Sequence, residues 1–569
     1  MTAVNVTLNS TKTYTIHIME FKSVNKTLQE SFIRNWDRPA LTNYQGMTLA
    51  YREVALRIAK LHIAFEQCGL KKGDKVAICS RNQANWGVSF LAAITYGAVA
   101  VPILHEFKPG NIHYLVNHSD SRVLFVDDVI WEGLQPEEMP DLQVVVQINT
   151  FKFLHVASEE LSYVREHLNE EFGKRYPDTF GQEDLNYYED SPEELAIINY
   201  TSGTSGFSKG VMLPYRALYS NIEFAAKDAC PMLKAGMNVV SMLPSAHMYG
   251  MMFEFLFEMT IGMHVHFLSR VPSPKIIMQA FQEIHPDIII AVPLVMEKVY
   301  KSKLKPLIDK TKLYRRIPIL GPTIEKKFCT ELTNSFGGQF EEVILGGAAF
   351  NPEVEKFLHK IGFHYTVGYG MTECAPIIGY AHWDKVKVGS AGRAALNMEI
   401  RIDSDDPQNV PGEVQVKGPN VCLGYYRNED ATRESFTDDG WFRTGDMGII
   451  DEDGYLFLRG RSKCMVLGPS GQNIYPEEVE ATINNFVYVV DSLVVEDDGG
   501  LTALIYPDWH QGELDGFSRS EFRKRICGLL PAINDELPKY AQIKKIELMP
   551  EDFERTPKKS IKRYLYQRN

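Results

Sequence analysis

The sequence predicts an α/β protein with two unequal domains. Three observations carry this prediction: β-branched runs alternate with helical patterns up to about residue 385, strands then become shorter and turns denser, and a unit with its own strands and helices begins at about residue 464. Such alternation is typical of βαβ units and mainly parallel sheet. We expect a large N-terminal domain of parallel α/β lobes plus a β-rich lobe, and a small, mobile α+β C-terminal domain.

The expected elements follow this division in order. A helical pattern covers 51–70 (YREVALRIAKLHIAFEQCGL), and buried-type strands are expected at 75–79, 122–128, 144–148, 195–200, 265–268 and 287–292. The β-rich lobe contains the turn-bounded runs 410–419, 434–442 and 451–460. In the last unit, helices are expected at 475–486 and 520–530, and strands at 492–497, 501–507 and 543–549. The junction lies at RGRSK, so the expected domains are 1–459 and 464–569, with a hinge at 460–463.

Composition excludes several classes of function. The chain has 569 residues, and 73 acidic against 60 basic residues give a net charge of −13, which disfavours nucleic acid as the main partner. Its eight cysteines are scattered without zinc spacing, as in a protein with reduced thiols, and the N-terminus lacks a secretory signal, so a cytoplasmic location is expected. The uncharged stretch 87–104 contains Gly97 and Pro102 and is interpreted as a buried helix that runs into a strand.

A glycine- and hydroxyl-rich loop follows the strand expected at 195–200. Glycines let backbone N–H groups turn toward an anion, hydroxyls add donors, and one lysine adds a positive charge. The residues of this phosphate cradle are Thr201, Ser202, Gly203, Thr204, Ser205, Gly206 and Lys209. The spacing is not that of a Walker A loop, because Gly210 follows the lysine where Ser or Thr is required. The alternative is a flexible linker, which is disfavoured because a strand leads straight into the loop.

Further motifs follow in a fixed order. They are PSAHMYG (244–250), GGAAF (346–350), YGMTE (369–373), VGSAGR (388–393), GWFRTGDMG (440–448), GYLFLRGRSK (454–463) and IYPEEVE (474–480). Together with the loop, they resemble the adenylate-forming superfamily, which includes acyl- and aryl-CoA ligases, luciferases and the adenylation domains of peptide synthetases. The wording of the motifs and the length are most similar to fatty acid-CoA ligases. The resemblance covers most of residues 195–480 and, more weakly, 46–128.

The resemblance implies a role for each matching residue. Glu373 would hold Mg²⁺, a cation that prefers carboxylate and phosphate oxygens, and Thr372 would contact the α-phosphate. Asp446 and Arg461 would bind the ribose, and Lys463 would be the hinge about which the small domain turns between two half-reactions. A narrow slot would hold the adenine ring and would be formed by Gly346, Gly347, Ala348, Tyr369 and Gly370. Gly471 would line the tunnel that takes the pantetheine arm of CoA.

The resemblance also implies a reaction and a substrate class. A carboxylate attacks the α-phosphate of ATP, pyrophosphate leaves, and the thiol of CoA cleaves the acyl-adenylate. His247 would form the gate between acyl pocket and nucleotide, and the Met- and Phe-rich run 242–259 suits an alkyl chain, although core packing would look the same. The segment SAHMYG lacks the Asp that pairs a substrate amino group in peptide synthetases, so a medium- or long-chain fatty acid is favoured over an amino acid.

One departure from the family affects the first half-reaction. The family ends with T-P-x-G-K-I-x-R, whose lysine contacts the carboxylate and the α-phosphate, and the corresponding run 556–563 has Ser560 at the lysine position. Lys559 would serve if the loop shifts by one residue, and Lys562 is a second candidate. Otherwise the chain is a weakened homologue that binds acyl groups or nucleotides. A third alternative is an acyl-AMP ligase that loads a carrier protein instead of CoA.

A basic stretch stands out in this acidic protein. Residues 298–327 hold ten basic side chains against Asp309 and Glu325. A solvated surface is one interpretation. The other is peripheral contact with anionic lipid headgroups on the inner face of the membrane, from which fatty acid would be collected.

Overall fold

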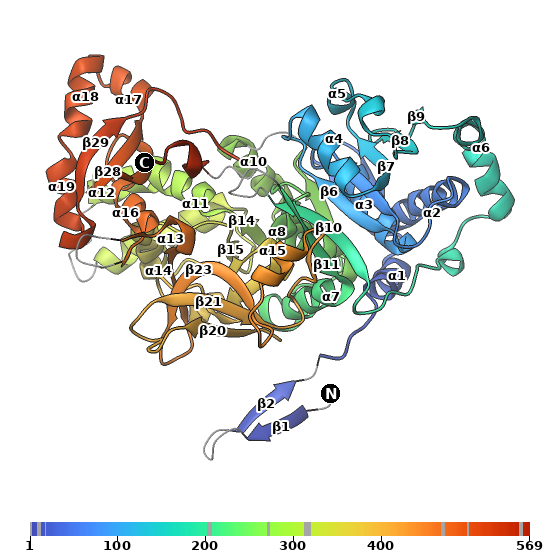
Figure 1. Ribbon diagram of the computed structural model, residues 1–569, viewed down its shortest axis with the longest axis horizontal. Helices are drawn as coiled ribbons and strands as arrows, with labels where there is room; N and C mark the ends of the chain where they lie inside the picture. The colour runs from blue at the N-terminus through green and yellow to red at the C-terminus, as the bar shows by residue number, and fades with distance from the viewer. Residues whose placement is uncertain are drawn as a thin grey trace.

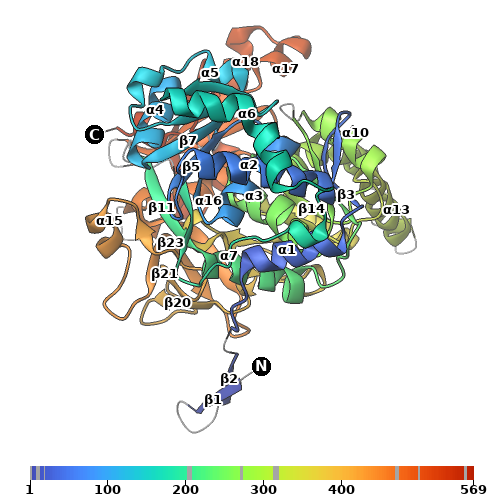
Figure 2. The ribbon, with the colours of Figure 1, turned by 90° about the vertical axis from the view of Figure 1, so that its right-hand side faces the viewer.

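The computed structural model describes residues 3–7, 13–17, 19–201, 208–269, 273–311, 320–467, 473–497, 500–556 and 561–568. A large domain occupies one side of the molecule and the small C-terminal domain, drawn in red, the other (Figure 1). An N-terminal hairpin of β1 (Ala3–Thr7) and β2 (Thr13–His17) projects from the body in both views (Figures 1 and 2). The expected α/β class with a separate C-terminal domain is confirmed.

The largest sheet carries the predicted phosphate loop. Its strand order is β22-β11-β10-β6-β5-β7-β8-β9, parallel from β10 to β8 and antiparallel at both ends. In that order the strands are Gly424–Tyr425, Lys209–Pro214, Leu195–Thr201, Val99–Ile103, Lys75–Cys79, Ser121–Val126, Val144–Gln147 and Phe153–Val156. The run β6, β5 and β7 is buried on both faces, because helices cover a parallel sheet on both sides.

Two further sheets lie beside the first, and both are parallel except for the antiparallel edge pair β3-β4. One has the order β12-β13-β3-β4, and the other β14-β15-β16; a parallel bridge between Val239 and Ile288 links them. Their strands are Asn238–Ser241, His264–Phe267, Pro39–Asn43 and Thr48–Ala50, then Ile289–Ala291, Val343–Leu345 and Tyr365–Val367. The carboxyl end of β15 leads directly into the GGAAF motif, which places that motif at the edge where α/β proteins bind ligands.

The lobe that was predicted to be β-rich is antiparallel. It contains β17-β18-β19 (Tyr369–Gly370, Ile377–Tyr380, Arg393–Ala394) and β20-β21-β23-β24 (Glu399–Asp403, Gly412–Lys417, Phe442–Ile450, Leu456–Arg461). A short helix, α15 (Glu429–Glu434), follows β22. This lobe contributes β22 to the edge of the largest sheet, so the phosphate strand β11 is paired with a segment more than two hundred residues later in the chain.

The helices of the large domain surround these sheets. Their bounds are α1 Val24–Arg34, α2 Tyr51–Gln67, α3 Ala84–Tyr96, α4 Pro109–His118, α5 Asp128–Trp131, α6 Glu159–Arg175, α7 Tyr215–Phe224, α8 Met248–Met251, α9 Phe257–Ile261, α10 Pro274–Ile284, α11 Pro293–Val299, α12 Lys305–Thr311, α13 Leu320–Ser335 and α14 Pro352–Ile361. The helix expected at 51–70 ends earlier, at Gln67, because Gly69 takes φ +67° and Leu70 N–H then bonds back to Phe65.

The stretch 87–104 forms most of helix α3 and strand β6, as predicted, and its side chains are almost all buried. Gly97 ends α3 in the left-handed region, which stops the helix before the strand begins. Within the described ranges, no helix has both the length and the apolar character needed to cross a membrane.

The small domain has a sheet of order β27-β28-β29, with β27 Val489–Asp497, β28 Gly500–Pro507 and β29 Ile543–Leu548. The pair β25-β26 (Val466–Leu467, Asn473–Ile474) precedes it, and its helices are α16 Pro476–Ile483, α17 Trp509–Leu514, α18 Arg519–Cys527 and α19 Leu530–Glu536. Its apolar clusters contain residues from 466 onward only, whereas those of the large domain end at Leu456. The two domains therefore have separate hydrophobic cores.

Candidate active site

The predicted phosphate loop connects the antiparallel strands β10 and β11. Thr201 and Lys209 stand opposite each other at the end of this ladder, so the two described ends of the loop are held together by the sheet. The loop residues Ser202, Gly203, Thr204, Ser205 and Gly206 lie outside the described residues.

Tyr425 brings the loop lysine close to the predicted metal carboxylate. The Nζ of Lys209 lies 4.6 Å from the centroid of the Tyr425 ring, and the Tyr425 hydroxyl donates to Oε1 of Glu373 at 3.0 Å. Burial, followed by the Glu373 charge, raises the pKa of Tyr425, so the hydroxyl keeps its proton and remains a donor. A cation and a carboxylate from distant motifs thus meet at one aromatic side chain.

Glu373 has the surroundings that a magnesium ligand needs. It lies in the 3₁₀ turn Thr372–Cys374, is 8% exposed, and its main chain is fixed by a bond from Cys422 N–H to its carbonyl at 2.8 Å. Within the described part of the chain, Tyr425 is the one donor to its carboxylate, which leaves lone pairs for a cation. The described residues contain no cluster of three metal-ligating side chains, and one carboxylate completed by phosphate oxygens is a common arrangement for Mg²⁺.

The predicted ribose carboxylate is held from two sides. The Tyr369 hydroxyl donates to Oδ2 of Asp446 at 2.6 Å, and Nε of Arg461 lies 2.8 Å from Oδ1. Burial raises the pKa of Asp446, while the positive charge of Arg461 opposes that rise. The three side chains come from β17, β23 and β24, and their contacts bring the predicted adenine-stacking and ribose-binding residues together.

The GGAAF motif forms an accessible edge at the end of β15. Gly347 has φ +84°, a conformation that favours glycine, and Gly347 and Ala348 are exposed. A Cβ on Gly346 would lie 3.1 Å from the Tyr249 ring, so a larger residue there would press on this side chain. Gly370 has a similar constraint, since its Cβ would lie 2.3 Å from the Pro376 carbonyl oxygen. Exposed backbone of this kind leaves room for a flat ring such as the predicted adenine.

Two asparagines fix the segment that carries His247. The side-chain amide of Asn199, on β10, donates to the Ala246 carbonyl at 2.9 Å. The side-chain amide of Asn82 donates to the Leu243 carbonyl and accepts from the Ser245 N–H group. His247 is half-buried at the N-terminus of α8. The phosphate strand and the His247 segment are therefore one connected unit.

The Met- and Phe-rich run lies inside the large domain. Its side chains are all buried and belong to the apolar core clusters: Met242, Met248, Met251, Met252, Phe253, Phe255, Phe257 and Met259. Tyr249 stands at the near end of this run, between Gly346 and Phe253.

The predicted hinge connects directly to the ribose contact. Arg461 ends β24, and Lys463 follows in the turn Ser462–Cys464, where its side chain is exposed. Gly460 has φ +151°, and its Cβ would lie 2.8 Å from an oxygen of Glu477 in α16. A bulkier residue at 460 would therefore press on the small domain.

The C-terminal motif is described on both flanks of its loop. Lys559 and Ser560 lie outside the described residues, as does Gly471. Lys562 pairs with Glu554 in its own segment at 3.1 Å, and Arg563 pairs with Glu480 of α16. The first-step role predicted for Lys559 or Lys562 stays a prediction.

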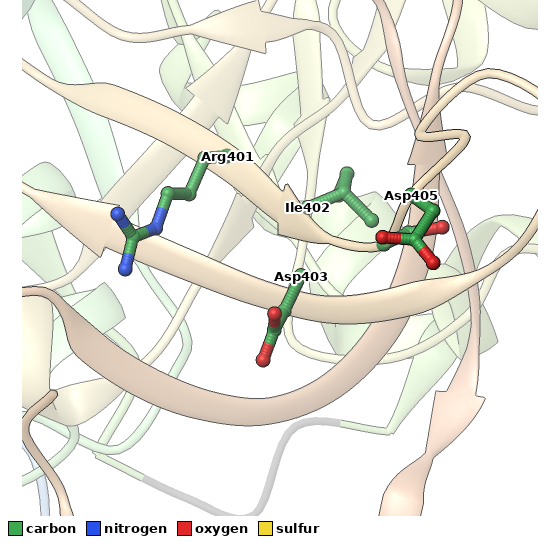
Figure 3. Close-up of a pocket in the computed structure, with 5 residues that line it drawn as sticks. Arg401, Ile402, Asp403 and Asp405 are labelled. Carbon is green, nitrogen blue, oxygen red and sulfur yellow. The ribbon is translucent and has the colours of Figure 1, made fainter.

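A surface pocket at the end of β20 is unrelated to these residues (Figure 3). It is lined by Arg401, Ile402, Asp403, Ser404 and Asp405, none of which was predicted as a site residue. The guanidinium of Arg401 is already paired with Asp439 at 2.6 Å and lies over the ring of Trp441.

Comparison with known proteins identifies the family. Residues 28–426 match the AMP-binding enzyme family, and residues 465–569 match the C-terminal domain of AMP-binding enzymes. The chain belongs to the AMP-binding enzyme family. The predicted adenylate-forming superfamily is thereby confirmed.

Relatives of this AMP-binding enzyme include two ligases. A long-chain-fatty-acid–CoA ligase of Escherichia coli O6:H1 is 26% identical over 548 residues, covering 91% of this chain and 92% of the relative. The long-chain-fatty-acid–CoA ligase FadD15 of Mycobacterium bovis is 26% identical over 473 residues, covering 78% and 74%.

Solved structures share the fold of this AMP-binding enzyme. The anthranilate CoA ligase AuaEII in complex with anthranoyl-AMP matches with a TM-score of 0.77 at 18% identity, covering 96% of this chain and 97% of that one. ATP-bound MatB from Rhodopseudomonas palustris matches with a TM-score of 0.73 at 23% identity, covering 96% of this chain and 98% of that one. O-succinylbenzoate CoA synthetase from Bacillus subtilis, in complex with ATP and magnesium ion, matches at 0.72 and 22%, covering 95% and 98%.

Sequence reasoning missed several residues of this AMP-binding site. Tyr425 links Lys209 to Glu373, and Tyr249 packs on Gly346, but neither lies at a motif position to which a role was given. The buried asparagines Asn82 and Asn199 carried no signal other than a polar residue next to a strand of buried type. Polar side chains at such positions are the signal that would have found them, because buried amides need partners.

Proposed function

We propose that this AMP-binding enzyme is an AMP-forming acyl-CoA ligase for a medium- or long-chain fatty acid. The observation that carries the proposal is the convergence of two linked groups, Lys209–Tyr425–Glu373 and Tyr369–Asp446–Arg461, from separate motifs. The first supplies charges suited to phosphates, and the second supplies acceptors and donors suited to a ribose. ATP, Mg²⁺ and CoA are the cofactors this reaction requires.

In the first half-reaction, a carboxylate oxygen attacks the α-phosphorus and pyrophosphate leaves. Negative charge increases around phosphorus, and Lys209 with Thr372 would stabilise it if they are already in place. Mg²⁺ bound at Glu373 would supply additional positive charge to the phosphate oxygens. Tyr425 holds the Glu373 carboxylate in one orientation, which limits reorganisation as the charge develops.

In the second half-reaction, the thiol sulfur of CoA attacks the acyl carbonyl carbon and AMP leaves with the bonding electron pair. The small domain would turn about Lys463 between the steps. Arg461 ends the strand before this turn and binds Asp446, so the hinge begins at a fixed point. Separate hydrophobic cores on the two sides of the hinge support such a motion.

Two observations support a fatty acid as the substrate. The curated relatives named above are ligases of long-chain fatty acids. The buried run behind Tyr249 offers methionine and phenylalanine side chains, which adapt to an alkyl chain, and SAHMYG offers no carboxylate for a substrate amine.

The decisive assay is pyrophosphate release with a panel of acids, with and without CoA. An acyl-CoA ligase should release pyrophosphate with unbranched fatty acids and form the thioester when CoA is added. Adenylate that accumulates and is unaffected by CoA would favour the carrier-loading alternative. Nucleotide binding without pyrophosphate release would favour a silent homologue, which the serine at position 560 motivates.

Peripheral contact with anionic lipid is a further part of the proposal. Of the basic stretch, Lys312, Arg315 and Arg316 lie outside the described residues, and nothing is described of the Lys303 side chain. Lys305 pairs with Glu353 at 2.8 Å and Lys327 with Glu331 at 3.8 Å, as expected for a solvated surface. Sedimentation with anionic vesicles at low and high salt separates the alternatives, because lipid contact predicts binding that salt removes.

A further inference from the structure

The two domains meet through polar contacts near the C-terminal end of helix α16. Since the described residues of the two domains share no apolar cluster, polar contacts join the small domain to the turn Tyr300–Leu304 and to the start of α14, and Arg459 of β24 pairs with Glu478 of α16 at 3.5 Å. A hydrogen bond contributes on the order of 1 kcal/mol net, so an interface of this kind is easily opened and closed. Individual polar residues there decide how long it stays closed.

Asn351 is the first of these residues, and it follows the nucleotide slot directly. Its Oδ1 accepts from the N–H groups of Glu353 and Val354, which caps α14. Because this cap fixes the oxygen of the amide toward the helix, the NH₂ group points the other way and donates to Oδ1 of Asn485 in the small domain. A residue three positions after Ala348 thus touches the small domain.

Lys301 makes the second contact from the neighbouring helical turn, Tyr300–Leu304. Its Nζ donates to the main-chain carbonyl of Asn484 at 3.0 Å. Asn484 is the C-terminal capping residue of α16, where carbonyl groups lack partners within the helix and carry partial negative charge. A cation is therefore well placed there.

The same asparagine connects to the base of the C-terminal motif. Asn484 Oδ1 accepts from Ser492 Oγ at 2.8 Å, and its amide nitrogen lies 3.4 Å from Asp491 Oδ1. Asp491 Oδ2 in turn binds Arg555 at 2.7 Å. Hydrogen bonds and an ion pair, together with the peptide link from Asn485 to Asn484, therefore connect the residue after the nucleotide slot to the segment that precedes the C-terminal motif.

We propose that Asn351 and Lys301 of the large domain and Asn484 and Asn485 of the small domain form a latch that couples nucleotide occupancy to the orientation of the small domain. These are positioning residues: none of them is placed against substrate. A nucleotide that contacts Gly346–Ala348 fixes the backbone leading to Asn351, and so favours the closed latch. The role in catalysis rests on the proposed function, whereas the coupling itself requires only that AMP binds.

The first test measures AMP affinity, because coupling between two sites is reciprocal. If AMP closes the latch, Asn485→Ala must weaken AMP binding although Asn485 belongs to the other domain. We expect a dissociation constant about fivefold higher by calorimetry, the factor that corresponds to one hydrogen bond. Lys301→Ala, on the opposite side of the interface, should give the same phenotype. Thr482→Ala on α16 and Lys298→Ala on α11 are matched controls and should leave the affinity unchanged.

The second test measures orientation. Fluorophores are attached to exposed Cys527 and to Val129→Cys in α5, after alanine replaces the half-buried Cys68, Cys329 and Cys464. When AMP is added to the labelled protein that retains Asn485, the distribution of energy-transfer efficiencies should narrow to one state. It should stay broad in the Asn485→Ala background. AMP affinity unchanged in both latch variants, or energy transfer that responds to AMP equally with and without Asn485, overturns the latch. Failure of all acids in the pyrophosphate assay would instead affect only the proposed function.

Discussion

The interior of the large domain and the junction with the small domain are built in opposite ways. Inside, Asp446 is held between a tyrosine hydroxyl and a guanidinium, and Glu373 between a tyrosine and a buried turn. At the junction, the contacts are amides, a lysine on a helix carbonyl and the exposed ion pair of Arg459 with Glu478, with separate apolar clusters on either side. The first arrangement fixes charges in place, and the second permits movement.

The difference follows from what each region must do in the proposed reaction. Stabilising charge at phosphorus is efficient when donors and cations do not have to reorganise, which requires buried and fully bonded partners. Alternating between two half-reactions requires an interface whose states differ by little free energy. Variants inside should therefore remove chemistry, whereas variants at the junction should change the balance between the steps.

The largest effect is expected inside, at Glu373. Replacement by Gln removes the negative charge that attracts Mg²⁺ but retains an acceptor for Tyr425, so adenylate formation should fall by about 10³-fold while the fold persists. Pyrophosphate release at several Mg²⁺ concentrations measures it. Glu434→Gln, at an exposed position of α15, is the control. A variant that turns over normally would show that this carboxylate does not bind the metal.

A gain of function is expected in the C-terminal motif, at Ser560. Lysine at this position should place a cation between the fatty acid carboxylate and the α-phosphate, and so raise the rate of pyrophosphate release by on the order of 10²-fold. Thioester formation from preformed acyl-AMP should hardly change. If Lys559 already provides the charge, Lys559→Ala should instead abolish the wild-type rate. No response to either substitution would remove the C-terminal motif from the active site.

The hinge should separate the two half-reactions most clearly. Lys463→Pro fixes φ near −65° and should hold one domain orientation, so that one step falls at least about tenfold more than the other. Single-turnover assays of adenylation and of thioester formation measure both. Lys463→Ala removes the side chain without restricting the backbone, so the ratio of the rates of the two half-reactions should not change. Equal losses in both steps would indicate misfolding rather than a blocked hinge.

The smallest effect concerns stability inside the large domain. Glu258 on α9 is 1% exposed, and burial raises the pKa of its carboxyl from 4.5 to about 8. Between pH 4.5 and about 8 the folded protein keeps a proton on Glu258 that the unfolded chain releases. The contribution of this carboxyl to the free energy of unfolding is therefore fully present below pH 4.5 and is lost as the pH rises to about 8. Gln cannot titrate. As the pH rises through this range, the free energy of unfolding of Glu258→Gln should therefore fall by up to a few kcal/mol less than that of the wild type.

Chemical denaturation at about pH 5 and about pH 8 measures this difference between the wild type and Glu258→Gln. The free energies of unfolding of the two proteins should diverge as the pH rises. Parallel changes in both proteins would show that the Glu258 carboxyl titrates normally and is not neutral in the folded interior. That result would weaken the contrast between a tightly packed interior and an adaptable junction.

Much of the fold could be predicted because it depends on local patterns. The strands β5, β8 and β10 lie where β-branched runs were found, and the buried helix and strand predicted for 87–104 are α3 and β6, since Gly97 and Pro102 break the apolar stretch. Ends were less accurate: the expected strand at 287–292 is only Ile289–Ala291, because its pairing with β15 covers just these three residues.

The sequence by itself determined the family and the order of its two matching regions, and it supplied the residue types proposed to bind phosphate, metal and ribose, because motif spacing carries them along the chain. Only the tertiary structure decided which side chains meet. Tyr369 bonds Asp446, Tyr425 joins Lys209 to Glu373, Lys562 pairs with Glu554, and Asn351 reaches Asn485. Such pairs depend on distance in space between residues far apart in the chain, and on the burial that makes each polar atom require a partner, neither of which a linear pattern contains.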